Sequence, residues 1–259
     1  MKSFSTFRKK SFTAVAVVAL SLGMLTASNS AKAQVTLGTF QNLSQADIDN
    51  VYKAFGFALK HRFYQPADTL GDWGFEIAFE ATVDLLNQET QTSLGKFGAS
   101  SLNVLPIPKL QVALGLPAGF EVGMGFLGGI QDLTLLSFGL VKTWLDLEFM
   151  AVDTRASFGT NKLSNFSATN WSFEAISSFP LGITEPYVYL GLAGASISLN
   201  DLNAQQLGQL AGLESSRSFT SAYFGFGLPL KLGFFHLRPE AQFFTIGEFS
   251  VGTRLAFVL

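Results

Sequence analysis

Apolar and polar residues alternate along most of the chain from residue 72 onward. The clearest stretch runs from Trp73 to Leu85, where alternate positions carry large apolar side chains and the positions between them include Glu76 and Glu80. Successive side chains of a β-strand point to opposite faces. The stretch therefore predicts a strand with one apolar face and one acidic face.

The same alternation recurs through the rest of the chain. It predicts ten strands, at 72–86, 109–116, 119–129, 133–144, 147–158, 168–179, 186–198, 217–228, 231–245 and 248–258. Their apolar faces carry Phe, Leu and Val, and their other faces are rich in Gly, Ala and Ser. Several are long enough to cross a tilted barrel wall, which takes about 9–11 residues. We expect an all-β fold: an antiparallel up-and-down transmembrane β-barrel of about ten strands with a short N-terminal helix.

A soluble β-sandwich also alternates and is the competing interpretation. Long strands, a bulky apolar face and small residues on the opposite face favour the barrel, because small residues suit a crowded lumen. The connections 87–108, 159–167 and 199–216 are long and polar, whereas most others are short. Barrels of the outer membrane place short turns in the periplasm and long loops outside. An even strand count then puts both ends of the barrel wall in the periplasm.

Two places break the pattern. Pro239 lies inside the strand predicted at 231–245 and removes a ladder donor, which predicts a bulge there. In 147–158 the apolar phase slips between Ala151 and Val152, so this strand is the least regular of the ten.

The first 33 residues have the pattern of an export signal. A basic head is followed by an apolar stretch from Phe12 to Leu25, and Ala31 and Ala33 supply the small residues that a signal peptidase reads. We expect cleavage between Ala33 and Gln34. The alternative is a membrane anchor, for which the apolar stretch is short. The predicted domains are a signal peptide (1–33), a periplasmic lead-in with a helix and a hatch (34–71), and the barrel (72–259).

The lead-in contains one helical pattern. Ser44 and Asp47 have the spacing of a capping box, and apolar residues recur at helical spacing through 44–60. These residues are Ile48, Val51, Phe55 and Leu59. A strand is the competing interpretation, because Phe55, Phe57 and Leu59 also alternate.

Composition narrows the class of protein. Of the 259 residues 48% are hydrophobic and 14% charged, and there is no cysteine. A chain without cysteine cannot be a lipoprotein, and an exported chain without disulfides favours a bacterial envelope. Five of the 17 basic residues and none of the 19 acidic ones lie in 1–33, so the mature chain is acidic. That balance disfavours a nucleic-acid partner.

Candidates for catalysis are few. The only histidines are His61, before the barrel, and His236, whose strand neighbours are Arg238 and Glu240. No serine motif accompanies them, and neither metal-ligand spacing nor a phosphate-binding loop occurs. We expect a protein that is not an enzyme and that needs no metal or cofactor.

Charged residues on the polar strand faces predict a cluster in the lumen. In a ten-stranded barrel the last strand pairs with the first, which brings Arg254 toward Glu76 and Glu80, with Glu240 approaching from the preceding strand beside Arg238. Charges inside a narrow barrel usually pair. The predicted role is structural, and cation selection by the acidic residues is the alternative.

The C-terminus resembles the assembly signal of bacterial outer-membrane proteins. The residues that carry the resemblance are Ser250, Gly252, Leu255 and Phe257, followed by two further residues where such signals usually stop at the aromatic. The resemblance implies insertion into the outer membrane by its assembly machinery. Contact with membrane lipid and lipopolysaccharide follows from that location.

A second resemblance concerns the lead-in. Residues 43–71 are similar to the N-terminal hatch of fatty-acid-transport-type outer-membrane proteins, with Gln65-Pro66-Ala67 where that family has an Asn-Pro-Ala turn. This chain is much shorter than those transporters. The resemblance implies a hatch and a small apolar ligand.

Two functions remain open on the sequence. One is a monomeric, porin-like barrel that acts as a hatch-gated conduit or binding protein for small apolar molecules. The other is a structural or adhesion barrel acting through loops 87–108 and 199–216, with no transport. Small inward residues such as Gly123 and Gly225 leave space for something to pack. We expect the helix to enter or cap the periplasmic mouth, with Gln65 and Pro66 turning the chain into the first strand.

Overall fold

The computed structural model describes residues 43–67, 70–97, 103–130, 133–163, 166–200 and 212–259. The expected signal peptide and its cleavage between Ala33 and Gln34 lie outside the described residues. So does the start of the lead-in, up to residue 42.

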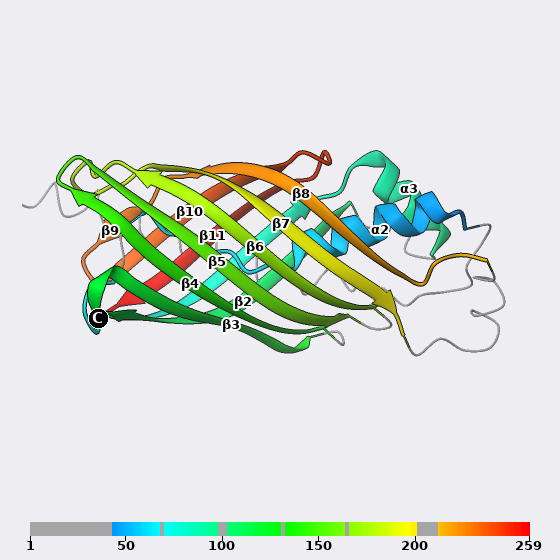
Figure 1. The fold of residues 1–259 in the computed structure, drawn as a ribbon, viewed down its shortest axis with the longest axis horizontal. Helices are drawn as coiled ribbons and strands as arrows, with labels where there is room; N and C mark the ends of the chain where they lie inside the picture. The colour runs from blue at the N-terminus through cyan, green and yellow to red at the C-terminus, as the bar shows by residue number, and fades with distance from the viewer. Residues whose placement is uncertain (1–42, 68–69, 98–102, 131–132, 164–165, 201–211) are drawn as a thin grey trace, which may run out of the picture. The chain divides into compact units, whose positions relative to one another are not determined.

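A single antiparallel sheet closes on itself to form the barrel (Figure 1). Its strands are β1 (Phe75–Leu85), β2 (Val104–Leu116), β3 (Phe120–Ile130), β4 (Leu133–Leu147), β5 (Met150–Leu163), β6 (Phe166–Ser178), β7 (Tyr187–Leu199), β8 (Ser216–Gly227), β9 (Leu230–Leu232), β10 (Phe235–Phe244) and β11 (Phe249–Val258). Neighbouring strands follow chain order, and β11 returns to pair with β1. The ten-stranded antiparallel barrel is confirmed.

Strands β8 and β9 together form one of the ten strand positions of the wall. Both pair with β10, with Gly227 opposite Glu240 and Leu230 opposite Leu237, so the register continues across Leu228 and Pro229. The prediction of a bulge at Pro239 is therefore wrong. Pro239 keeps its register with Thr253 of β11, and its carbonyl accepts from Leu228 N–H. The missing donor faces the break between β8 and β9, where no continuous strand needs it.

A bulge occurs elsewhere, in β4. The register of β4 against β5 shifts between Thr143 and Leu145. Alternation in β5 itself is unbroken, with Ala151, Asp153 and Arg155 buried at alternate positions. The apolar phase slip seen in the sequence arises because small Ala151 faces inward, whereas Val152 and the later apolar residues face outward.

Strand β2 begins five residues earlier than the sequence predicted. Its first residues, Val104 to Lys109, pair with β1, whereas pairing with β3 begins only at Leu110 opposite Phe126. Pro106 and Pro108 lie in the part that β3 leaves unpaired. Proline is tolerated at such an edge because no partner requires its missing N–H.

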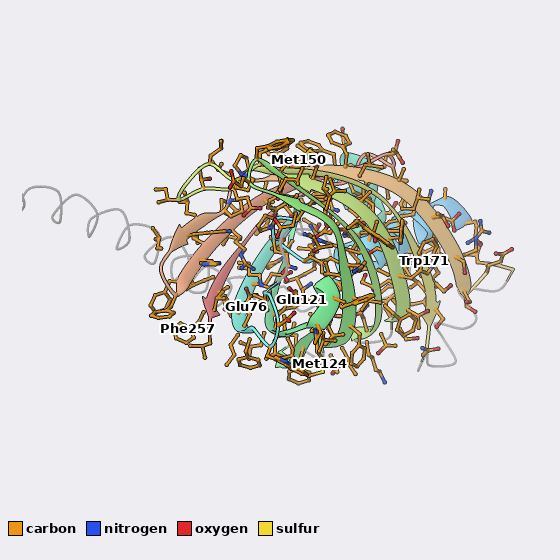
Figure 2. All side chains as sticks on the ribbon, turned by 60° about the vertical axis from the view of Figure 1, so that its left-hand side comes forward. Glu76, Glu121, Met124, Met150, Trp171 and Phe257 are labelled. Carbon is orange, nitrogen blue, oxygen red and sulfur yellow. The ribbon has the colours of Figure 1, made fainter. Side chains whose placement is uncertain are left out.

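The outer face of the wall is apolar over its whole circumference. Figure 2 shows Met124, Trp171 and Phe257 outside the barrel and Glu76 and Glu121 pointing inside. Exposed large side chains on successive strands include Ile77, Leu110, Phe126, Phe138, Phe158, Phe173, Leu190, Phe226 and Phe235. A belt of this kind on a closed barrel is the signature of contact with lipid, because closure leaves no unpaired edge in the bilayer.

The two ends of the barrel differ. The first residue of β1 and the end of the chain lie side by side, since Phe75 and Leu259 exchange two backbone hydrogen bonds. The turns 117–119 and 148–149 lie at this end, which we call the short-turn end. The strand ends that are joined by the connections 86–103 and 200–215 lie at the other, the long-loop end. By the rule for outer-membrane barrels, the short-turn end faces the periplasm.

Two helices cover the long-loop end. Helix α2 (Gln45–Ala58) packs against α3 (Gln88–Lys96) and the ends of β6, β7 and β8 (Figure 1). The capping box of Ser44 and Asp47 is present, so the helical interpretation of the lead-in is confirmed. Helix α3 lies in a stretch that the sequence predicted to be a long, polar connection. Within the described residues, neither helix has the length and apolar character needed to cross a bilayer.

The prediction that the lead-in helix lies at the periplasmic mouth is wrong. Tyr52 of α2 donates to the carbonyl of Ser215 in the β7–β8 connection, and Phe55 stacks on Phe166 at the start of β6. Both partners belong to the long-loop end, opposite the mouth where the sequence placed the helix. The physical reason is that the long-loop ends of the strands turn apolar residues inward, whereas the lumen nearer the short-turn end is charged.

Candidate functional site

The lumen of the barrel is filled by the chain's own lead-in. From α2 the chain descends inside the barrel to the start of β1, and every described residue from Leu59 to Ala67 is buried. We call residues 59–67 the plug and the two helices α2 and α3 the cap. The four predicted hatch residues, Ile48, Val51, Phe55 and Leu59, are all at most 3% exposed.

The wall binds the backbone of the plug. Lys109 Nζ donates to the carbonyl of Lys60 at 3.1 Å, and Gln111 Nε2 donates to that of Arg62 at 3.1 Å. The other bonds of this kind join Arg254 to the carbonyl of Phe63 at 2.5 Å and Arg155 to those of Gln65 and Pro66 at 2.8 and 2.6 Å. An extended segment without a neighbouring strand has unpaired carbonyls, and these side chains satisfy them.

The plug's own cations pair with carboxylates of the wall. Lys60 Nζ lies 3.2 Å from Glu174 of β6, and Arg62 lies 2.8 Å from Asp84 of β1. Gln65 donates to Glu121 of β3 at 2.9 Å. Gln65 and Pro66 therefore lie in the lumen before the start of β1, where side chains of the wall bind them. Buried charges are stable only when paired, so these contacts fix the plug in one register.

The predicted charge cluster divides into three groups. Glu76 contacts both Arg238, at 2.7 Å, and Arg254. Glu80 instead pairs with Lys109 at 2.9 Å, although it is the register partner of Arg254. Glu240 accepts hydrogen bonds from two tyrosines, Tyr187 and Tyr189, at 2.6 and 2.7 Å. The structure thus brings three of the five residues together and gives the other two different partners.

Small residues of the lumen make room for aromatic rings. A Cβ at Gly252 would lie 2.0 Å from the hydroxyl of plug residue Tyr64, and one at Gly139 would lie 2.6 Å from the ring of Phe63. Gly225 and Gly227 are covered in the same way by Tyr189 and Tyr187 of the wall. The space left by glycine is thus filled partly by the plug and partly by tyrosines.

A serine and a histidine meet in the lumen. His61 Nδ1 lies 2.8 Å from Ser137 Oγ, and both side chains are buried. The rings of His61 and Phe63 pack edge to face, and glycines of the wall lie beside His61. In the described part of the chain no carboxylate hydrogen-bonds to this histidine, so a third residue to orient it as a base is missing. The pair lies inside the plug contact, and we assign it to packing.

The cap encloses an apolar cluster. On α2, Phe55 stacks on Phe166 at 5.4 Å between ring centres, and Phe57 lies 5.2 Å from Phe244. Phe97, just after α3, reaches the same Phe166 at 6.3 Å. Inward apolar residues of the strand ends complete the cluster: Leu133, Leu135, Ile197 and Leu199. The lumen is therefore apolar under the cap and charged along the plug.

Few polar contacts hold the cap at its rim. Asp47 of α2 accepts from Lys96 of α3 at 2.8 Å and from Ser93 at 3.2 Å. Burial opposes ionisation of Asp47, but the hydrogen bonds from Lys96 and Ser44 outweigh it and lower its pKa to about 2. Asp49 of α2 pairs with Arg217 of β8 at 3.3 Å.

Glu248 ties α3 to the β10–β11 connection. Its carboxylate accepts long hydrogen bonds from Asn87 and Thr90, both 3.4 Å. Burial, together with the nearby charge of Asp84, raises the pKa of Glu248 to about 7. The rim contacts of the cap thus include one carboxylate that titrates near neutral pH.

Sequence reasoning missed the cations that build this site. They are Lys60, Arg62, Lys109 and Arg155. A signal existed: the inward positions of the predicted strands carry more carboxylates than cations. The run Lys60-His61-Arg62 in an otherwise apolar stretch of the lead-in supplies part of the missing positive charge.

Comparison with known proteins finds distant structural likenesses. No protein-family profile matches the chain, and no curated protein is significantly similar to it. One similar structure is the N-terminal β-barrel domain of Pseudomonas aeruginosa OprF, with 16% identity, 73% of this chain and 99% of that chain covered, and a TM-score of 0.36.

Two further similar structures are also barrels. Ail of Yersinia pestis, the attachment invasion locus protein, in complex with the heparin analogue sucrose octasulfate, shows 11% identity over 73% of this chain and 99% of that one, with a TM-score of 0.32. The KdgM porin in complex with disordered oligogalacturonate shows 6% identity over 70% and 98%, with a TM-score of 0.37. The closed wall and its apolar belt, which belong to this chain itself, make it an integral β-barrel protein of the bacterial outer membrane.

Proposed function

We propose that this protein binds small apolar molecules beneath its cap and admits them to the lumen when the cap and plug shift. The proposal involves no chemical reaction. The observation that supports it is the apolar cluster enclosed by α2 and α3 at the long-loop end. Binding sites for small molecules are mostly apolar, with a few polar groups.

The cap is suited to opening because its polar attachments are few and lie at the rim. Asp49 with Arg217 of β8 is a partly exposed pair, whereas Asp47 with Lys96 joins the two helices within the cap, and such pairs contribute at most about 1 kcal/mol each. Apolar contacts provide most of the attachment of α2. An apolar ligand can replace those contacts with its own, so exchange at this place costs little.

The plug provides the second barrier. Its carbonyls and cations are bound by buried side chains of five strands, so it blocks the lumen while the cap opens and closes. Passage through the barrel therefore requires a second rearrangement, in which several buried polar contacts must find new partners. Binding and conduction are separate events on this structure.

Two deletions separate these events. Removing residues 35–58 takes away α2 and leaves the plug, whereas removing residues 35–70 takes away the whole plug as well. Both proteins are refolded into lipid vesicles, and heat-resistant mobility on gels shows whether the barrel forms. Dialysis of amphipol-held protein against radiolabelled naphthalene measures binding, and single-channel recording in a planar bilayer measures conductance.

The expected results differ between the two proteins. The full chain binds naphthalene saturably and conducts little. The shorter deletion loses saturable binding but still conducts little, and the longer deletion conducts ions. A full chain without saturable naphthalene binding, together with a longer deletion that folds and does not conduct, would contradict the proposal and favour an adhesion barrel acting through its loops.

A further inference from the structure

Two buried amides at the edge of the apolar cluster have no hydrogen-bond partner. Asn161 of β5 and Asn170 of β6 point into the lumen and are 4% and 1% exposed. None of their four amide atoms is hydrogen-bonded within the described residues. A buried amide without a partner destabilises a protein, so its retention calls for an explanation.

Several polar side chains close to the two asparagines are hydrogen-bonded. One register step from Asn170, Ser172 is hydrogen-bonded to Ser157 across β5 and β6 at 2.7 Å. Ser137 on β4 is bound to His61. A Cβ at Gly159 would lie 2.7 Å from the Asn170 side-chain oxygen, so the amide extends over the glycine opposite it. The two asparagines therefore differ from these neighbours in that no polar atom of their side chains is paired, a property shared by Gln242 of β10 among the described residues.

Both amides adjoin the cap. Asn170 is the register partner of Ala195 on β7, and Ala195 faces Gly56 of α2, where a Cβ would lie 2.6 Å from it. Asn161 is opposite Ala168, two residues from the Phe166 on which Phe55 stacks. The two amides thus lie at the boundary of the apolar cluster, where one end of a molecule bound under the cap would be placed.

The charges nearby exclude an anionic group. The inward lysines and arginines of the described chain already contact carboxylates, as with Lys60 and Glu174 or Arg155 and Asp153. A buried carboxylate at the two asparagines would have no free cation, which is costly. Two amides offer both N–H donors and carbonyl acceptors, and hydroxyl and carboxamide groups match this pattern.

We propose that the ligand is a neutral amphiphile, with its apolar body in the cluster under the cap and one hydroxyl or carboxamide group bound by Asn161 and Asn170. The inference rests on the proposed function and specifies its ligand. The missing hydrogen bonds of the two amides are completed by the ligand.

Four probes with the same chain length test the head group. Amphipol-held full chain is dialysed against radiolabelled 1-octanol, octanamide, octanoate at pH 8, and octane. Octanol and octanamide are expected to bind at least about tenfold more tightly than octane or octanoate, since one net hydrogen bond corresponds to about that factor. Saturable binding of all four with equal affinity would overturn the neutral-head proposal but leave the proposed function standing. Binding of none would overturn both.

The double variant Asn161→Leu with Asn170→Leu tests the two residues. Because it removes unpaired buried amides, it is expected to fold at least as stably as the native chain. It should bind octanol about tenfold more weakly and octane as before. The matched control is Gln242→Met on β10, separated from β6 by β7 and β8, which removes another unpartnered buried amide and should leave octanol binding unchanged.

A folding defect does not leave the question open. If the leucine variant fails to fold, Asn161→Ser with Asn170→Ser keeps a hydroxyl at each place and should retain a preference for octanol over octane that is smaller than in the native chain. Unchanged octanol affinity in either folded variant would overturn the assignment of the two asparagines.

Discussion

The plug and helix α2 of the cap belong to one stretch of chain, yet the barrel holds them by different forces. Along the plug, buried cations and amides of the wall bind backbone carbonyls, and Lys60 and Arg62 enter ion pairs that are almost fully buried. Under the cap, aromatic rings such as Phe55 and Phe166 provide the contact, and ion pairs occur only at the rim.

The difference shows how one barrel can be both sealed and accessible. Buried polar contacts are directional, and breaking one leaves a desolvated group without a partner. Apolar contacts have no direction, so one apolar surface can replace another at little cost. The polar contacts therefore fix the plug in one position, whereas the apolar contacts of the cap can be replaced by contacts with another apolar molecule.

The largest expected effect concerns the plug. Arg254→Leu removes the contacts to Glu76 and to the carbonyl of Phe63, so it should lower the free energy of unfolding by about 3–5 kcal/mol. Urea unfolding in lipid vesicles measures the change. The control Lys142→Leu removes an outward cation of β4 and should cost less than about 1 kcal/mol.

Glu80→Gln should fall between these two variants. A glutamine can still accept a hydrogen bond from Gln111, and Lys109 keeps the carbonyl of Lys60. Equal losses for Arg254→Leu and Glu80→Gln would argue against a special importance of the Arg254 contacts.

The second effect concerns the cap. Phe55→Ala removes a ring that stacks on Phe166, and it should lower the local stability of α2 by about 3 kcal/mol. Hydrogen exchange of the α2 amides should therefore accelerate, while the strands of the barrel exchange as before. Phe158→Ala, on the lipid-facing side, serves as the control and should leave α2 unchanged. Faster exchange throughout the barrel would show that cap and wall unfold together.

The third effect is that of the rim contact at Asp47. Its pKa is lowered in the folded chain, so it contributes stability above the usual value of 3.8 and loses that contribution as the pH falls toward about 2. Asp47→Asn should cost at most about 1 kcal/mol at neutral pH. Hydrogen exchange of α2 between pH 5 and about 3 should vary less in this variant than in the native chain.

The smallest effect concerns Glu248 and has the opposite sign. Its pKa is raised to about 7, so the folded chain favours the protonated form and the attachment of α3 weakens as the pH rises from 4.5 to 7. Protease cleavage within α3 should accelerate over that range. Glu248→Gln should abolish the acceleration, and a profile identical to that of the native chain would argue against this carboxylate.

The sequence predicted the wall better than the lumen, for a physical reason. Alternation depends only on neighbouring positions, so the ten strands could be located from the sequence, and a residue such as Phe126 or Glu121 could be assigned to its face. Pro106 and Pro108 are compatible with the first part of β2 because β3 leaves that part unpaired. The faces of the strands follow from local chemistry.

The plug depends on contacts that local patterns do not encode. Lys60 meets Glu174, and Arg254 meets the carbonyl of Phe63, across more than one hundred residues. Nothing in the helical spacing of Ile48 and Phe55 indicates which end of the barrel α2 covers. The register pairing of Arg254 with Glu80 was predictable, but Lys109 on the other side of β1 competes for the same carboxylate.

The course of the lead-in also constrains the order in which the barrel forms. The wall closes where β11 meets β1, a pairing between the two ends of the sheet, and such distant contacts form late because closing a long loop is entropically costly. Once that seam is complete, residues 59–67 are enclosed on all sides. A charged segment that binds five strands through buried groups cannot be threaded afterwards through a lumen filled with tyrosines. The strands must therefore curl around the lead-in while the seam is still open, so that the segment is enclosed as the barrel closes.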